Sequence, residues 1–199
     1  TKTVRVNRDG TAPSVHIDTP AEGAVVRGPS VTVTGTASDD GGGPVTVEVN
    51  GQAATVSGGA FTAQVTAADG PLTLEAVARD AANNSATDSV RVTVDSAPPV
   101  IEVTEPAVRT VNGTSVRVAG TVRDASSVTL TLDGQPVPLS GEAFATEVAL
   151  GGEGTRVLRL EAVDAAGNRG SIEVPLTIDR TPPTLALIEP AADAVLGDL

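Results

Sequence analysis

Asp95-Ser96-Ala97-Pro98-Pro99 returns 84 residues later as Asp179-Arg180-Thr181-Pro182-Pro183, and Asp9-Gly10-Thr11-Ala12-Pro13 is a looser copy near the start of the chain. Each copy is followed by a short alternating stretch that ends in proline, such as Ile101-Glu102-Val103-Thr104-Glu105-Pro106. A solenoid of short stacked elements repeats every ~20 to 45 residues, which is much shorter than this spacing. The repetition therefore predicts a string of small, complete domains.

The repeat divides the chain into two complete units, residues 10–95 and 96–180. Residues 1–9 resemble the end of the first unit and are expected to be the last strand of a preceding repeat. Residues 181–199 resemble the start of the second unit and are expected to begin a following repeat. The sequence thus indicates a window from a longer array.

Period-two alternation runs through both units, and no stretch keeps a helical period. Val31-Thr32-Val33-Thr34 and Val128-Thr129-Leu130-Thr131-Leu132 are examples. Strands with one apolar and one polar face are typical of antiparallel sheets. Asn50-Gly51 and Asp133-Gly134 lie between such runs and predict type I′ hairpins, because both central residues of that turn need positive φ.

The number and spacing of the strands predict seven antiparallel strands per unit, with no long helix. Seven short strands over about 85 residues indicate a two-sheet, immunoglobulin-like β-sandwich. The chain has no cysteine or tryptophan, so each core is expected to be aliphatic around one phenylalanine, Phe61 or Phe144. In the second unit the predicted strands are 100–104, 114–122, 127–132, 135–139, 143–149, 155–163 and 169–178. Pro136 and Pro138 place the fourth of these at a sheet edge, because proline cannot donate to a strand ladder.

Landmarks repeated in both units carry a resemblance to a known family. Gly35-Thr36-Ala37-Ser38-Asp39 matches Gly120-Thr121-Val122-Arg123-Asp124, and Asp80-Ala81-Ala82-Asn83-Asn84 matches Asp164-Ala165-Ala166-Gly167-Asn168. Together with the Asp-x-x-Pro-Pro linkers, these spellings resemble the tandem immunoglobulin-like repeats of bacterial surface proteins and adhesins. The resemblance covers essentially the whole chain. It implies a sandwich fold, but it leaves the function of the parent protein open.

Composition excludes several functional classes. The net charge is −12, from 25 acidic and 13 basic residues, and such a surface repels nucleic acid. No apolar run is long enough to span a membrane, so no membrane insertion is expected in this segment. Without cysteine there is no disulfide framework, thiolate zinc site or cysteine nucleophile. The single histidine, His16, is expected to face solvent, and no catalytic triad can be assembled around it. We therefore expect no enzymatic activity.

Aspartates are the one set of residues that suggests a site. In a seven-strand sandwich, the loops after the second and sixth strands lie at the end where the preceding unit's last strand arrives. This topology gathers Asp95, Asp124 and Asp164 at the junction between the two units. Asp9, Asp39 and Asp80, with Asp40 as an additional candidate, gather at the junction before the first.

Two interpretations of these aspartates remain open. Ca²⁺ binds six to eight oxygens with irregular geometry, and a cation at each junction would stiffen the array. The resemblance supports this interpretation, because some bacterial immunoglobulin-like arrays are thought to stiffen in this way. Alternatively, each aspartate only caps its own turn through the backbone or is solvated.

The expected function is structural: a spacer, stalk or fibre segment of a secreted or cell-surface bacterial protein. Its partners would be the neighbouring repeats of the same protein. One alternative is an adhesive module that binds another surface protein or a glycan, although the scarcity of aromatic residues disfavours glycan stacking. The other is a set of accessory domains in a larger extracellular enzyme.

Overall fold

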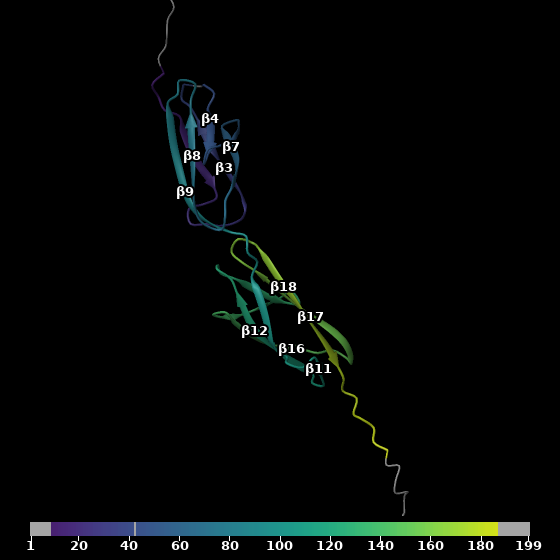
Figure 1. Ribbon diagram of the computed structural model, residues 1–199. Coiled ribbons are helices and arrows are strands. Elements are labelled where there is room, and N and C mark those ends of the chain that lie inside the picture. Colours follow the sequence, from purple (N-terminus) through teal and green to yellow (C-terminus); the bar gives the residue numbers. More distant parts are fainter. Residues whose placement is uncertain (1–8, 42, 187–199) are drawn as a thin grey trace, which may run out of the picture.

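The computed structural model describes residues 9–41 and 43–186, and every regular element in this part of the chain is a β-strand. The described residues accordingly include no helix of the length and hydropathy that a membrane span requires. The strands form two β-sandwiches that lie end to end (Figure 1). We call the sandwich of strands β1–β9 the first unit and that of β10–β18 the second unit. The predicted fold class, tandem immunoglobulin-like sandwiches, is confirmed.

The first unit packs a four-stranded sheet, in the order β1-β3-β7-β6, against a five-stranded sheet, in the order β2-β9-β8-β4-β5. Alternate side chains of β3 and β7 are buried between the sheets, as their valine–threonine alternation predicts. The strands are β1 (Ser14–Thr19), β2 (Val25–Arg27), β3 (Ser30–Ser38), β4 (Thr46–Val49), β5 (Gln52–Ala53), β6 (Thr55–Ser57), β7 (Ala60–Thr66), β8 (Gly70–Arg79) and β9 (Ser85–Asp95).

The second unit repeats this arrangement, with sheets in the orders β10-β12-β16-β15 and β11-β18-β17-β13-β14. Residues Thr181 to Ala186 follow it without regular structure, and the rest of the expected next repeat lies outside the described residues, as does most of the expected preceding strand. The strands are β10 (Val100–Glu105), β11 (Thr110–Val111), β12 (Ser115–Arg123), β13 (Thr129–Leu132), β14 (Gln135–Val137), β15 (Leu139–Ser140), β16 (Ala143–Ala149), β17 (Gly154–Val163) and β18 (Arg169–Ile178).

The prediction of seven antiparallel strands per unit needs two corrections. The predicted strand 135–139 is divided between the two sheets: β14 pairs with β13, and β15 pairs with β16. Pro136 lies within β14, and Pro138 is the one residue between β14 and β15. β14 is an edge strand, as predicted. In addition, β2 and β11 pair in parallel with β9 and β18. These additional strands are two or three residues long, too short to show an alternation in the sequence.

A glycine and a phenylalanine define the centre of each core. Gly35 on β3 lies opposite Phe61 on β7, and Gly120 on β12 lies opposite Phe144 on β16. Both rings are buried, with 1% and 3% of their surface exposed. A Cβ on Gly35 would meet the Phe61 ring at 2.4 Å and the backbone oxygen of His16 at 2.1 Å. The glycine therefore makes room for the ring on one side and for β1 on the other.

The predicted hairpin turns are confirmed by the backbone. Asn50 and Gly51 have φ of 48° and 77°, and Asp133 and Gly134 have 48° and 79°. In the loop after β8, Asn83 takes the positive φ that Gly167 takes in the second unit, 67° against 85°. Asparagine tolerates this region better than other residues with a side chain, which explains the substitution between repeats.

His16 is exposed, as predicted, but it also takes part in a contact between the two sheets. Its Nδ1 lies 3.0 Å from Asp88 Oδ2, and the same oxygen accepts a hydrogen bond from the backbone N–H of Ile17. The Ile17 bond, opposed by partial burial and helped by bonds to Ser89 and His16, lowers the pKa of Asp88. Asp88 thus links β9 to β1, across from one sheet to the other.

Candidate metal centre at the joint between the units

The joint between the units is short and anchored. Four residues separate the end of β9, at Asp95, from the start of β10, at Val100. Gly28 N donates to the Asp95 carbonyl oxygen at 3.1 Å. Asp69 accepts from both the backbone N–H and the hydroxyl of Ser96, at 3.0 and 2.9 Å. The linker is therefore held against the first unit before it enters the second.

Asp95, Asp124 and Asp164 meet at this joint. Each offers a carboxylate oxygen, and these oxygens lie within 4.8 Å of one another. Asp95 and Asp164 are each only 7% exposed, and Asp124 is partly buried. The end of β9, the loop after β12 and the loop after β17 supply one residue each. Topology thus brings together the three residues that the sequence placed here, and we call them the joint cluster.

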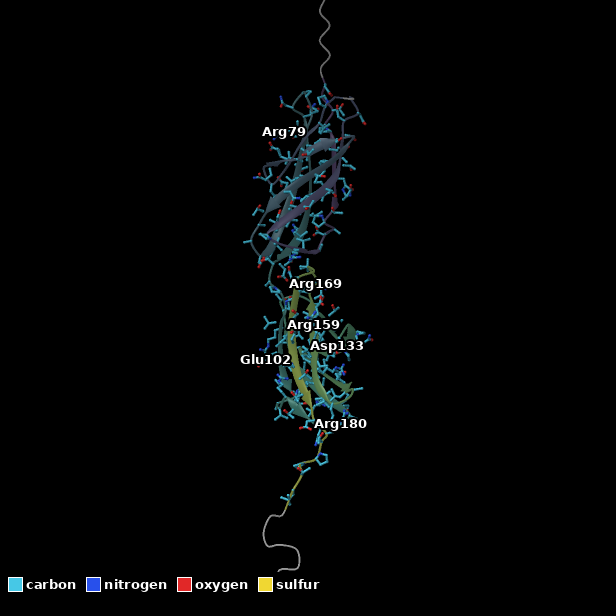
Figure 2. All side chains as sticks on the ribbon, turned by 90° about the vertical axis from the view of Figure 1, so that its right-hand side faces the viewer. Arg79, Glu102, Asp133, Arg159, Arg169 and Arg180 are labelled. Carbon is cyan, nitrogen blue, oxygen red and sulfur yellow. The ribbon has the colours of Figure 1, made fainter. Side chains whose placement is uncertain are left out.

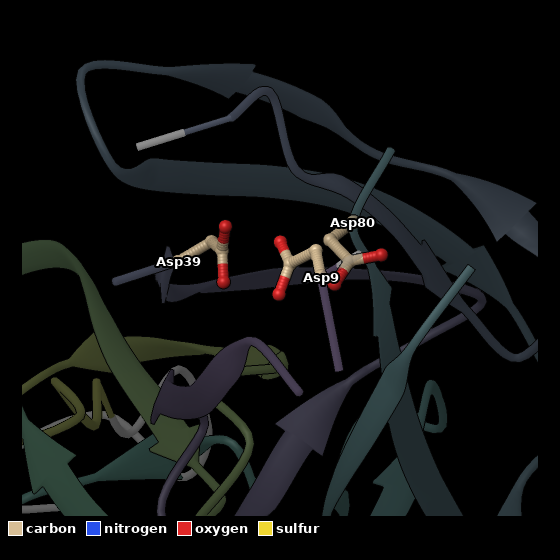
Figure 3. A group of neighbouring side chains, drawn as sticks. All are labelled: Asp9, Asp39 and Asp80. Carbon is tan, nitrogen blue, oxygen red and sulfur yellow. The ribbon is translucent and has the colours of Figure 1, made fainter. Parts of the chain in front are cut away.

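Asp9, Asp39 and Asp80 form the equivalent outer cluster at the far end of the first unit, again with oxygens within 4.8 Å. Figure 3 shows the three side chains close together, with Asp9 between Asp39 and Asp80. Asp39 Oδ1 is buried and has no hydrogen-bond partner among the described residues. Asp40, the additional candidate, is exposed and does not belong to this group.

Turn capping accounts for part of both clusters. In the joint cluster, Oδ1 of each aspartate accepts a local backbone N–H: from Ala97 to Asp95 at 3.1 Å, from Ser126 to Asp124 at 2.8 Å, and from Asn168 to Asp164 at 2.8 Å. These bonds account for only one oxygen of Asp95 and of Asp124, and no described donor reaches the other. Capping and cation binding are therefore compatible at Asp95 and Asp124, where they use different oxygens. At Asp164 both oxygens accept from Asn168, so an ion would share an oxygen with a hydrogen bond.

In the outer cluster, hydrogen bonds of the loop after β8 lower the pKa of Asp80. Burial on its own would raise the pKa of Asp80, but hydrogen bonds from the Asn84 side chain and from backbone N–H groups of the loop outweigh it and lower the pKa. Asn84 donates through both its side chain and its backbone, at 2.7 and 2.9 Å. The loop thus favours the ionised form, which is the form that binds a cation.

Within residues 9–41 and 43–186, no basic side chain forms an ion pair with any of the six aspartates of the two clusters. Figure 2 shows Arg159 and Arg169 along the second unit, where they pair with Glu173 and Glu161 of the neighbouring strand. Two ionised carboxylates 4.8 Å apart repel by about 3 kcal/mol at an effective dielectric constant of about 20. A divalent cation would convert this repulsion into attraction.

The donor set suits a hard cation. Carboxylates from three separate segments match the irregular oxygen coordination of Ca²⁺ better than the strict octahedron of Mg²⁺. The residues that would hold the ion are Asp95, Asp124 and Asp164 at the joint, and Asp9, Asp39 and Asp80 at the outer end.

Two asparagines beside these clusters were not predicted from the sequence. Asn168 is 3% exposed, and its Nδ2 donates to Asp164 Oδ2 at 2.8 Å and to the Asp95 carbonyl oxygen at 3.1 Å. Asn84 makes the same pair of contacts with Asp80 and with the Asp9 carbonyl oxygen. A signal was present, because an asparagine ends the repeated Asp-x-x-x-Asn loop in both units.

Comparison with known proteins agrees with this fold. The family model of glucodextranase domain B matches residues 13–96, which is the first unit. Bacillopeptidase F of Bacillus subtilis (strain 168) is 32% identical over 98 residues. That match covers 49% of this chain but only 7% of Bacillopeptidase F, so the chain spans a small fraction of that relative's length.

Solved structures share the fold at low identity. The fibronectin(III)-like modules of Clostridium thermocellum CbhA align with a TM-score of 0.53 and 19% identity, over 87% of this chain and all of theirs. The N-terminal eight immunoglobulin domains of Down Syndrome Cell Adhesion Molecule align with a TM-score of 0.50 and 16% identity, over 84% of this chain and 24% of theirs. At this identity the likeness concerns the fold alone.

Proposed function

We propose that this chain is a spacer segment in a secreted or cell-surface bacterial protein, a stretch of tandem immunoglobulin-like units that acts through its length and stiffness. The observation that carries the proposal is the joint, where a linker of only four residues follows Asp95. Gly28 of the first unit and Asn168 of the second both bond to the Asp95 carbonyl oxygen. Asp69 holds Ser96, the first residue of the linker. Such a linker restricts the angle between the units, whereas a flexible linker would let them turn freely. We include in the proposal that these units belong with the bacterial surface-protein repeats that their landmarks resemble.

The proposal includes a divalent cation, with Ca²⁺ the best match, at each aspartate cluster. Two observations support it beyond the gathering of acids. Oδ1 of Asp39 is buried and has no hydrogen-bond partner among the described residues. Asp95 and Asp164 are buried, and neither belongs to an ion pair that the described residues form. An ion at the joint cluster would connect the end of β9 to two loops of the second unit. The cation would thus stiffen the connection that the hydrogen bonds already define.

A second candidate function is that of accessory domains in a larger extracellular enzyme. The matches to a domain of glucodextranase and to part of Bacillopeptidase F favour it. The two roles are compatible, because an accessory domain that holds other domains apart is also a spacer. We propose no catalytic role for the residues of this segment.

The adhesive alternative has less support. Large apolar side chains exposed in the second unit are Val100, Val108 and Val157. They come from β10, the loop after it and β17, and single exposed valines are ordinary on protein surfaces.

The experiment that tests the spacer proposal is small-angle scattering with a parallel melting curve, in Ca²⁺ and in chelator. In Ca²⁺ we expect an elongated particle, and chelator should shorten it. At a Ca²⁺ concentration of about 100 Kd, binding adds about 2.7 kcal/mol, which raises the Tm of a domain of this size by roughly 10 °C or more. Asp124→Asn, which removes one carboxylate of the joint cluster, should abolish most of the response of the second unit.

Glu147→Gln is the matched control, because it removes one negative charge from an exposed position of the same unit. It should leave the response to Ca²⁺ intact. A compact, side-by-side pair in Ca²⁺ would contradict the spacer role. Identical melting and scattering curves in Ca²⁺ and in chelator would contradict the cation and leave turn capping as the role of the aspartates.

A further inference from the structure

The carbonyl oxygen of Asp95 accepts hydrogen bonds from both units. Gly28 N of the first unit and Asn168 Nδ2 of the second unit each donate to it at 3.1 Å. In the parallel pairing of β9 with β2, Asp95 lies opposite Arg27, so its backbone is part of the first unit's sheet. One backbone atom at the joint thus belongs to the hydrogen-bonded structure of both sandwiches.

A steric contact lies beside this shared acceptor. A Cβ added to Gly170, on β18, would lie 2.0 Å from the backbone oxygen of Pro99. Pro99, the last residue of the linker, is itself buried. The linker therefore packs directly on the second unit at one end while its other end is bonded to the first. The repeat places Ala86 at the equivalent position of the first unit, so this close approach is a property of the present joint.

Residues of both units also line one shallow groove at the joint. Val25 and Gly70 contribute from the first unit, and Ala125, Ser126 and Ala165 from the second. The small side chains on the second unit's side bring its two loops close to the end of β9. The two units therefore approach each other beside the linker.

We propose that the two units unfold as a coupled pair, and that the bond from Asn168 to the Asp95 carbonyl carries most of the coupling. When the first unit unfolds, its hydrogen bond from Gly28 no longer holds Asp95 in place. The buried side-chain amide of Asn168 then either loses the Asp95 carbonyl as its acceptor or keeps it only by fixing an otherwise mobile segment of chain. Leaving a buried donor without its partner costs more than a typical hydrogen bond contributes. Coupling free energies are reciprocal, so the first unit gains from a folded second unit by the same factor.

The test is amide hydrogen exchange of the whole chain in chelator, which removes any contribution from a cation. Val33→Asp and Val118→Asp each place a carboxylate at an equivalent, fully buried core position and unfold the first or the second unit. In Val33→Asp, core amides of β17 and β18 should lose protection about tenfold, the factor that one buried hydrogen bond makes. In Val118→Asp, core amides of β8 and β9 should lose protection by the same factor.

Asn168→Ala tests whether the coupling depends on the hydrogen bond from Asn168 to the Asp95 carbonyl oxygen. In this variant, Val33→Asp should lower the protection of the core amides of β17 and β18 less than twofold. Asn84→Ala, the same change at the outer end of the first unit, should leave the full response. If Asn168→Ala does not fold, Asn168→Ser, which keeps a polar side chain but shortens it, takes its place with the same expected result. Unchanged protection in both core variants, or a full response in Asn168→Ala, would overturn the proposal.

Discussion

Phe144→Ala is expected to lower the free energy of unfolding of the second unit by about 3 to 5 kcal/mol, because it deletes the largest side chain from a buried position in an otherwise aliphatic core. Phe144 is 3% exposed, and the neighbouring side chains of that core are branched aliphatics that cannot expand to fill the space. Domains of this size are stable by about 5 to 15 kcal/mol, so the variant unit should be marginal at 25 °C. Phe61→Ala should do the same to the first unit.

Amide exchange resolved by residue measures this loss in each unit separately. Val157→Ala is the control, because the side chain is 52% exposed and should change stability by less than about 0.5 kcal/mol. A loss below about 1 kcal/mol for Phe144→Ala would show that the ring is not the centre of the core.

Gly120→Ala should destabilise the second unit by about 3 kcal/mol, at the upper end of the usual cost of overpacking. The added Cβ would lie 1.9 Å from the backbone oxygen of Glu102 and 3.0 Å from the Phe144 ring. Since one of these atoms is backbone, β10 itself must move to admit a methyl group. The φ of Gly120 is not in the left-handed region, so the cost is steric and would also apply to serine. Denaturant unfolding followed by far-ultraviolet circular dichroism measures it.

Gly152→Ala tests the same chemical change where there is space. No atom lies within 4 Å of a Cβ at Gly152, and its φ is not positive. The free energy of unfolding of the second unit should stay equal to that of the unchanged protein or rise slightly, because alanine lowers the conformational entropy of the unfolded chain. Equal effects of Gly120→Ala and Gly152→Ala would refute the steric explanation.

The regular parts of this fold could be predicted because the local rules agree with one another. Alternation predicted the long strands, and Asn50-Gly51 and Asp133-Gly134 predicted turns whose positive φ the backbone shows. The repeat alone predicts that Asp95, Asp124 and Asp164 lie together, because the topology of a sandwich brings the end of β9 and the two loops to one end. Whether the clusters bind a cation remains a prediction.

The remaining features depend on contacts between distant segments, which no local pattern encodes. β11 has two residues and therefore no period, and its partner β18 lies more than 60 positions away. Asp88 stabilises β1 from the opposite sheet, and the second unit has Ile172 at that position, so the repeat carried no signal. Asp69 bonds to Ser96 only because β8 and β9 bring them together.

A distance distribution between two labels tests most directly whether the joint holds the units in one arrangement. The chain has no cysteine, so Ser57→Cys and Ser140→Cys give two attachment sites at equivalent, exposed positions of the two units. Double electron–electron resonance in Ca²⁺ should give a single narrow peak, limited in width by the label. A broad distribution, or several peaks, would mean that the units swivel about the linker, and would contradict the account of a spacer that works by fixed reach.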